Sequence, residues 1–519
     1  MPTASRLTSR TPVLLAGAGV SGSLTALELA RHGVPSMVVE RSGGPGRFPD
    51  LLLLSGRSME LLRRLGLNAE LRAAGTDPAR PVDIVWSTGL DRPPIVAWRM
   101  PPVAELWAAA GTGDGTTSIE PYLVISGPEL SARLRRAVLD HPLIDLRTRW
   151  TLTDLRVETD TVLATVIAAE SGARQIVEAA YLAGCDGADS TVRRCAGLAL
   201  DPVGPAYPHL SVYFRNASLA GRWERPAAVI TGDLTVVAGY DGDLCVAHLP
   251  LTAGAQAVLG DPAGLLARRL SPAGEPSEVV AVVERGGEPA VARSYRRGRV
   301  FLAGSAAHQA VLPGDDVDSC VGDAIDLGWR LAGAVRGWAG EAVLAEYAVE
   351  RRGHALRERE QAGRARRTRV ELLSLAASEP DPEELAEAVR AWAPRLDLNR
   401  TGPADQAGRP GFRPPAFRLP GGEELFDRLG PQFTLVDSTS DQRGWPLVTA
   451  ARERRLPVRH LPVAGVPTPP AWSGRLVLIQ PGQRVAWCGD DLPADCDDVL
   501  DLVTGTRSRP LETQVYENT

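Results

Sequence analysis

The sequence predicts an α/β protein built from more than one domain, and three observations support this. Residues 12–40 place a short apolar strand directly before a glycine-rich turn and a helix, and a second apolar strand follows. Strand–helix–strand units of this kind form parallel sheets. Residues 147–185 alternate apolar and polar side chains, as half-buried strands do. A chain of 519 residues is too long for one hydrophobic core, which favours two or three domains.

The glycine-rich turn has the spacing of a dinucleotide-binding loop. It reads Gly17-x-Gly19-x-x-Gly22, with Val20 and Ser21 before the last glycine. The first glycine makes the tight turn, the second lets the backbone approach a pyrophosphate, and the third lets the helix pack on the strand. The diphosphate is expected at the N-terminus of the helix.

The second strand ends in a carboxylate at the position where such a loop needs one. Glu40 follows the apolar residues 36–39 and stands 18 positions beyond the last glycine, with Arg41 next to it. A carboxylate there accepts hydrogen bonds from the ribose of an adenosine. We therefore predict an ADP-containing cofactor, bound by the turn, Glu40 and Arg41. A glycine-rich turn without a ligand is the alternative.

Composition excludes several classes of protein. The net charge of −6 and the absence of a basic face argue against a nucleic-acid partner. No run of about 18 apolar residues is present to span a membrane, and the N-terminus lacks an apolar signal core, so we expect a cytoplasmic protein. The 6 cysteines lack CxxC spacing, which argues against a disulfide framework and against a zinc or other metal site.

The rest of the chain divides by pattern. We expect a helix over 128–140, a β-rich region over 201–290, a strand over 299–303, a helix over 323–336 and a long helix over 342–377. The Arg- and Glu-rich run 350–369 predicts a solvated helix face. Residues 401–422 are rich in Pro and Gly and predict a linker. A separate strand–helix–strand module follows over 423–519.

Three ordered segments and the C-terminal module resemble one family. The segments are the turn at 17–40, YLAGCDGADSTVRRCAGL at 181–198, and GRVFLAGSAAH at 298–308, which leads into GDAIDLGWRLAGAVRG. Together they resemble the class A flavoprotein monooxygenases, and among them the aromatic polyketide hydroxylases. The module containing GPQFTLVDS and RLVLIQPGQRVAW is similar to the thioredoxin-like domain of those hydroxylases.

This resemblance implies a division into domains and a cofactor. The fold class is α/β, with a Rossmann-like FAD-binding domain, a β-rich substrate domain in the hydroxylase fold and a C-terminal thioredoxin-like domain. The implied boundaries are 1–78, 121–200 and 291–400 for the FAD-binding domain, 79–120 and 201–290 for the substrate domain, 401–422 for the linker and 423–519 for the thioredoxin-like domain. FAD is the implied cofactor, a small-molecule polyketide the implied partner, and the protein is expected to be a monomer or a homodimer.

The resemblance also assigns cofactor contacts to two further motifs. Asp186-Gly187 is implied to lie near the dinucleotide, although a plain turn is the alternative for these two residues alone. The third motif, Gly304-Ser305, is implied to hold the ribityl chain and the pyrophosphate. The loop that follows it adds three candidate cofactor contacts, Pro313, Asp316 and Val317.

Four positions depart from the pattern of a hydroxylase. Ser305 replaces the family's aspartate, which accepts a hydrogen bond from a ribityl hydroxyl. The loop 313–320 replaces a glycine-rich GGxGxNTG stretch. Phe48-Pro49-Asp50-Leu51 stands where the family has a Pro-Arg-Ala stretch whose arginine takes part in the flavin and NAD(P)H region, so that a cation becomes an anion, and Gly127 replaces a glutamine. All four concern flavin redox chemistry or nicotinamide access, whereas the ADP-binding residues are intact.

The loop departure predicts an electrostatic effect. Asp315, Asp316 and Asp318 are expected to bring up to three carboxylates near the flavin ring. One carboxylate about 5 Å from an anionic ring costs roughly 3 kcal/mol at an effective dielectric constant near 20. Reduction of the flavin is therefore expected to be harder than in a hydroxylase.

Three functional hypotheses remain open from the sequence. The first is a redox-neutral FAD-containing cyclase, similar to the dialkyldecalin synthases of antibiotic biosynthesis, which form a decalin by a Diels–Alder-type [4+2] cycloaddition with FAD in a structural role. The second is an NAD(P)H-dependent FAD monooxygenase that hydroxylates a polyketide. The third is a non-catalytic flavin-binding homologue.

Catalytic residues are not identified by any motif. Candidates come from the β-rich region, where His209, Tyr213, Tyr240 and His248 stand among apolar neighbours. A satisfied core or strand side chain is the alternative for each. His308 matches a family position close to the flavin, without an assigned role.

Overall fold

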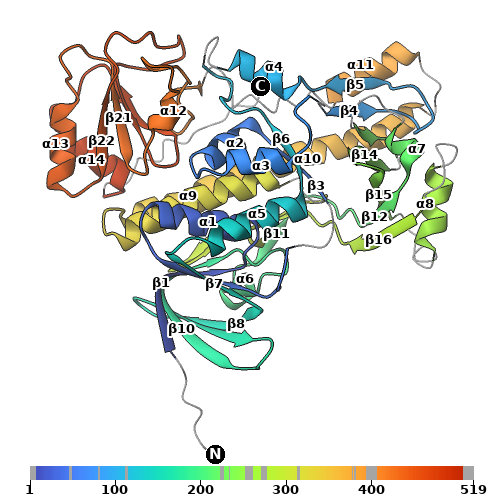
Figure 1. Cartoon of the computed structure of the whole chain (residues 1–519), viewed down its shortest axis with the longest axis horizontal. Coiled ribbons are helices and arrows are strands. Elements are labelled where there is room, and N and C mark those ends of the chain that lie inside the picture. The colour runs from blue at the N-terminus through green and yellow to red at the C-terminus, as the bar shows by residue number, and fades with distance from the viewer. Residues whose placement is uncertain are drawn as a thin grey trace, which may run out of the picture.

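The computed structural model describes residues 8–45, 50–79, 82–110, 115–221, 227–232, 234–251, 261–270, 278–312, 316–376, 378, 381–392 and 406–506. It arranges them as two large sheets and a smaller C-terminal sheet, with helices between them (Figure 1). The Phe48-Pro49 and 313–315 segments named above lie outside the described residues.

The first large sheet carries the predicted dinucleotide-binding turn. Its main path runs β18-β19-β10-β1-β2-β7, with β8 and β9 extending from β10, and β1 pairs in parallel with both β2 and β10. The strands are β1 (Thr8–Ala16), β2 (Ser36–Glu40), β7 (Ile144–Thr148), β8 (Trp150–Val157), β9 (Val162–Ala168), β10 (Arg174–Gly184), β18 (Arg296–Arg297) and β19 (Val300–Leu302). The predicted α/β class is confirmed, and the strand expected over 299–303 is β19.

Three helices pack together beside this sheet (Figure 1). They are α1 (Val20–Arg31), α5 (Gly127–Leu139) and α9 (Val317–Val335). The helix predicted over 128–140 is α5, which Ser126 caps by accepting from the amide of Glu129. Helix α9 begins six residues before the predicted start, because buried Val317, Cys320 and Val321 continue its apolar stripe into the loop that was expected before it.

The second large sheet comes from the β-rich region. Its strands are β4 (Asp83–Trp86), β5 (Val96–Arg99), β12 (His209–Arg215), β13 (Ala227–Ile230), β14 (Thr235–Asp241), β15 (Leu244–Pro250) and β16 (Glu278–Arg285), in the order β16-β12-β15-β14-β13-β4-β5. Alternate residues of β12, namely Leu210, Val212 and Phe214, belong to a hydrophobic core that also includes residues of α7 (Ala217–Ala220) and α8 (Pro262–Leu270). Because side chains alternate along a strand, His209, Ser211 and Tyr213 lie on the opposite face.

Shorter elements connect the two sheets. The strands are β3 (Leu51–Leu54), β6 (Leu123–Ser126), β11 (Leu200–Pro202), β17 (Ala290–Ala292) and β20 (His308–Gln309). The helices are α2 (Gly56–Arg63), α3 (Asn68–Ala74), α4 (Val103–Ala109) and α6 (Thr191–Cys195), with a short 3-10 helix at Gly304–Ala306.

The long charged helix α10 (Glu341–Ala376) corrects one prediction. The run 350–369 was expected to be a solvated face, yet Arg351, Arg359 and Arg369 are buried. Arg351 forms an ion pair of 2.6 Å with the buried Asp323 of α9. The arginines are buried because α10 packs against α9 and, further along, against α11 (Pro382–Trp392), which the composition of the run does not reveal.

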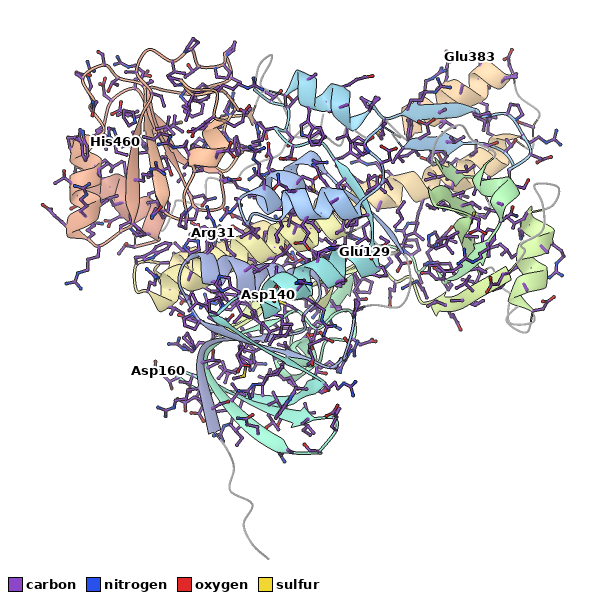
Figure 2. The ribbon with its side chains drawn as sticks, viewed as in Figure 1. Arg31, Glu129, Asp140, Asp160, Glu383 and His460 are labelled. Carbon is purple, nitrogen blue, oxygen red and sulfur yellow. The ribbon has the colours of Figure 1, made fainter. Side chains whose placement is uncertain are left out.

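The C-terminal module has a four-stranded sheet in the order β22-β21-β23-β24 (Figure 1). Its strands are β21 (Phe433–Asp437), β22 (Val458–Pro462), β23 (Leu476–Ile479) and β24 (Val485–Gly489), and its helices are α12 (Leu425–Arg428), α13 (Trp445–Glu453) and α14 (Cys496–Thr504). Trp329 of α9 packs edge-on against Phe433, so the module rests on the first domain. Figure 2 shows Arg31, at the end of α1, on the side that faces this module, and Arg31 Nη2 donates to the Leu429 carbonyl at 3.4 Å.

The segment predicted as a linker is held by a buried ion cluster. Arg413 donates to both carboxylate oxygens of Glu60 on α2, and Arg57 forms a second ion pair of 2.9 Å with Glu60. Glu60 is buried. Burial alone would raise its pKa, but the charges of Arg413 and Arg57 outweigh this and lower the pKa. The described residues of the segment, 406–422, are therefore fixed to the first domain at this point.

All 6 cysteines are free thiols. Within the described part of the chain, no helix is both long and apolar enough to cross a lipid bilayer.

We predict that Arg413→Met destabilises the protein. The substitution leaves a buried carboxylate with one of its two cations, and breaking a buried ion pair costs about 3 kcal/mol. Thermal or urea unfolding measures the loss. Arg136→Met is the matched control, since Arg136 pairs with Asp140 (labelled in Figure 2) on an exposed face of α5. Equal stability of the two variants would contradict the prediction.

Candidate functional site

The glycines of the first motif leave room for a phosphate group. Gly17 has φ +98°, and a Cβ there would strike the Cys185 carbonyl, while a Cβ on Gly22 would strike the Gly17 carbonyl. A Cβ on Gly19, by contrast, meets nothing within 4 Å. Gly19 is the N-cap of α1, and no side chain accepts from the first amides of this helix. An open space beside free helix amides fits a diphosphate.

Glu40 is held in place beside this turn. Its carboxylate accepts from the amide of Ala18 at 2.7 Å and from the amide of Ser42 at 2.7 Å. It is therefore fixed between the glycine-rich turn and the end of β2. Val20 and Ser21 start α1, where the Ser21 hydroxyl donates to the Cys320 carbonyl of α9 at 3.2 Å. Arg41 is exposed.

The second motif is ordered by its own aspartate. Asp186 accepts from the Ser190 hydroxyl at 2.5 Å and from the Thr191 amide at 2.7 Å, so it stabilises the start of α6. Gly187 has φ +80°. Arg193 of α6 donates to the Ala306 carbonyl at 2.8 Å, which joins the second motif to the third.

The third motif is clamped by α9. The Gly304 amide donates to Asp323 at 2.9 Å, and the Ser305 hydroxyl donates to Asp316 at 2.9 Å. His308 lies 3.2 Å from the same oxygen of Asp323 through Nε2. Burial alone would lower the pKa of His308, but the hydrogen bond and charge of Asp323, with the charge of Asp316, raise it. The three motifs thus converge at the N-termini of α1 and α9.

The predicted effect of the loop carboxylates on the flavin needs correction. Asp318 accepts from the Ser58 hydroxyl at 2.5 Å and from the Ser55 amide at 3.0 Å, so it points to the start of α2. Burial raises its pKa. Asp316 is engaged by Ser305. Asp318 is therefore turned toward α2, whereas Asp316 stays beside the third motif with Ser305 as its donor. Asp315 and the candidate Pro313 lie outside the described residues.

A polar cluster joins the first domain to the second sheet. The Tyr213 hydroxyl donates to Asp50, and Arg285 of β16 donates to Asp50 at 3.2 Å and to the Tyr213 oxygen at 3.2 Å. The Gly127 amide donates to the Asp50 carbonyl at 2.7 Å. The anion predicted at position 50 therefore has a cationic partner, Arg285, and does not present a lone negative charge. Burial is the main cause of the raised pKa values of Asp50 and Tyr213.

Two histidines extend this cluster. Arg285 Nε donates to the Ser211 oxygen at 3.2 Å, and the Ser211 hydroxyl lies 3.0 Å from His248 Nδ1. Burial, with the charge of Arg285 adding to it, lowers the pKa of His248 to about 3. His209 stacks edge-on against His248 at 5.9 Å, and burial also lowers its pKa.

The structure therefore brings together three of the four predicted catalytic candidates. His209, Tyr213 and His248 share one face of the second sheet, while the side chain of Tyr240 lies outside the described residues. Sequence reasoning missed Arg285 and Ser211. The signal for Arg285 is weak: it ends the apolar run of β16, and only the strand register places it beside His209.

Comparison with known proteins establishes the family. The family model described as an FAD binding domain matches residues 10–231 and 276–362, which is more than half of the chain. These segments contain all three motifs. The chain belongs to this family of FAD-binding-domain proteins.

Individual relatives agree over nearly the whole length. The chain is 27% identical over 504 residues to the FAD-dependent monooxygenase opdD of Penicillium oxalicum, covering 85% of this chain and 96% of that protein. It is 26% identical over 563 residues to the tetracenomycin A2 monooxygenase-dioxygenase of Streptomyces glaucescens, covering 94% and 95%. The structure of the rebeccamycin biosynthetic enzyme RebC with reduced flavin has a TM-score of 0.82 and 27% identity, covering 96% of this chain and 100% of that one.

The cofactor of this protein is FAD, and its fold is the FAD-binding hydroxylase fold. The residues present fit the group, since the open space at Gly19 and the free amides of α1 suit its diphosphate. Glu40 is placed for the adenosine ribose. When bound, FAD supplies a redox-active aromatic ring.

We predict that Gly19→Ala weakens FAD binding at least tenfold while leaving the fold intact. The added methyl group meets no protein atom within 4 Å but enters the space beside the helix amides. Fluorescence titration of the apoprotein with FAD gives the dissociation constant. Gly286→Ala is the control, because its Cβ also meets nothing and it lies on an exposed turn after β16. Unchanged affinity in Gly19→Ala would argue against the phosphate site.

We predict a pH dependence that originates at His308. A histidine whose pKa is raised on folding contributes stability below its ordinary pKa of 6.5, and this stability is lost as the pH rises through the raised value. The thermal midpoint of the wild-type protein should therefore exceed that of His308→Gln most below pH 6.5, and the difference should shrink as the pH is raised from 6.5. A constant difference across this range would show that His308 acts only by packing.

Proposed function

We propose that this protein is an FAD-containing enzyme of polyketide natural-product biosynthesis that forms a decalin by redox-neutral [4+2] cycloaddition. One observation carries the proposal. At position 50, where the hydroxylases it resembles have an arginine for the flavin and NAD(P)H region, this chain has an aspartate bound to Tyr213 and Arg285. A cation that would favour an anionic nicotinamide cofactor is replaced by a carboxylate fixed to the second sheet.

The same cluster supplies donors for a carbonyl group. Among the described residues, Arg285 donates through Nε and Nη2 and no acceptor is found for its Nη1, and His248 lies beside Ser211 in the same cluster. Hydrogen bonds from such groups to the carbonyl oxygen of a dienophile stabilise the charge that develops there during cycloaddition. Tyr213 is a positioning residue, because its hydroxyl is committed to Asp50 and its oxygen to Arg285.

The rest of this sheet face is covered by helices. Moving from His248 across the sheet, the register passes Thr235 and Ile230 to Trp86 and Val96, which pack in one buried cluster with Leu372 of α10 and Leu385 of α11. The polar cluster at His248 and Arg285 would therefore receive the carbonyl group of a linear polyene. Holding such a chain folded supplies the proximity and orientation that a cycloaddition needs.

The proposed reaction balances without any electron donor. Two carbon–carbon σ bonds form between the diene and the dienophile, three π bonds become one, and no atom enters or leaves. FAD then has a structural role, consistent with the intact ADP-binding residues and the altered third motif.

NAD(P)H-dependent hydroxylation of a polyketide is the second candidate. The relatives are named as monooxygenases, and the described loop carboxylates Asp316 and Asp318 are held by protein donors. The electrostatic repulsion that the sequence predicts between the loop carboxylates and a reduced flavin ring is therefore smaller.

We also propose the domain division given by the sequence, in which 423–519 form a thioredoxin-like domain. The hydrophobic clusters support it, since the second sheet has its own core and most buried residues of another cluster belong to the C-terminal module, although Trp329 and Val343 of α9 and α10 also join that cluster.

We predict that the purified protein cyclises a synthetic linear polyene bearing a conjugated diene and an unsaturated carbonyl, without NAD(P)H or oxygen. Arg285→Met should lower the rate by about a hundredfold or more, which is the cost of losing one oxyanion donor. Arg215→Met is the control, because Arg215 is exposed at the other end of β12 and pairs with Asp243. Product is followed by mass spectrometry, since cyclisation leaves mass unchanged and hydroxylation adds one oxygen.

Anaerobic mixing of the holoprotein with NADPH or NADH separates the two candidates. No loss of the oxidised-flavin absorbance supports cyclisation. Rapid loss of this absorbance, followed by formation of an oxygenated product when air is admitted, would contradict the cyclase proposal and support hydroxylation.

A further inference from the structure

Asp316 occupies a helix-capping position without capping the helix. It is the N-cap of α9, where aspartate normally accepts from the second or third helix amide. Here its side chain makes no such bond and instead accepts from the Ser305 hydroxyl at 2.9 Å. Among the residues that the structure describes, the first amides of this 19-residue helix therefore have no side-chain acceptor.

The turn at 304–306 does not need this contact to keep its shape. Asp323 already fixes the Gly304 amide at 2.9 Å, and Arg193 fixes the Ala306 carbonyl at 2.8 Å. The Ser305–Asp316 hydrogen bond is thus additional to the two that clamp the turn. The Asp316 side chain therefore turns away from the helix amides toward Ser305 without being needed to hold the turn. Binding of a ligand by Asp316 would explain this orientation.

The pair retains hydrogen-bonding capacity on its accessible side. Ser305 donates to Asp316 Oδ2 and also has a side-chain hydrogen bond with Cys320, which leaves, among the described residues, the Oδ1 atom of Asp316 without a donor. Ser305 is half-buried and the Asp316 side chain is 13% exposed, so both are reachable. His308 Nδ1, which is buried without a hydrogen-bond partner among the described residues, lies 3.6 Å from Asp316 Oδ2.

We propose that Asp316 and Ser305 act as one unit that binds a hydroxyl group of the ribityl chain of FAD, with Asp316 supplying the carboxylate. The family pattern has a carboxylate at position 305. In this chain the carboxylate belongs to Asp316 at the start of α9, which is hydrogen-bonded to Ser305. A hydroxyl donating to a carboxylate forms a charge-assisted bond, about twice as strong as a neutral one. The inference rests on the FAD cofactor and not on the choice between cyclase and hydroxylase.

A charge-swap experiment tests the unit. Asp316→Ser should raise the dissociation constant of FAD for the apoprotein at least tenfold, while that of ADP, which has no ribityl chain, stays within twofold. The double variant Ser305→Asp/Asp316→Ser returns the carboxylate to the turn and should restore FAD affinity to within threefold of wild type. Fluorescence titration with FAD and calorimetry with ADP supply the constants.

Asp318→Asn is the matched control. It removes a carboxylate from the same helical turn, but one that faces Ser55 and Ser58 of α2, so it should leave FAD affinity within twofold. If Asp316→Ser fails to fold by circular dichroism, Asp316→Asn gives the same test with the side-chain size kept. Unchanged FAD affinity, an equal loss for ADP, or a folded double variant that does not recover would each overturn the proposal.

Discussion

The buried carboxylate of Asp323 holds the cofactor side of this protein together. It accepts from the Gly304 amide, lies 3.2 Å from His308 and forms an ion pair of 2.6 Å with Arg351. Burial alone would raise its pKa, but Arg351 and His308 outweigh this and hold the pKa at about 2. A buried charge is tolerated only when its partners are complete. The third motif, α9 and α10 are therefore fixed relative to one another by one side chain, and the Ser305–Asp316 pair is built on this base.

A second link, through Asp50, connects the cofactor domain to the substrate sheet. Asp50 follows β2 in the chain, yet its carboxylate is bound by Tyr213 and Arg285 of the second sheet. The segment between the glycine-rich turn and α2 is thereby tied to the second sheet.

The local features of the fold were predictable because they depend on neighbours in sequence. The turn at Gly17, the strand ending in Glu40 and helix α5 follow from spacing, apolar period and capping within about 30 residues. The burial of Arg351 could not be predicted in this way, because its partner Asp323 lies 28 residues away on another helix. Charge patterning alone cannot distinguish a solvated arginine from one that neutralises a buried carboxylate.

By itself, the sequence determined that the chain binds the adenylate part of a dinucleotide, because that site is made of backbone geometry and one carboxylate within a single strand–helix–strand unit. Only the tertiary structure decided where the remaining charges act. It turned Asp318 toward α2, joined Asp316 to Ser305 and placed Arg285 beside His209. The reason is physical: the effect of a charge depends on its distance to partners and on burial, and both are set by contacts between segments far apart in the chain.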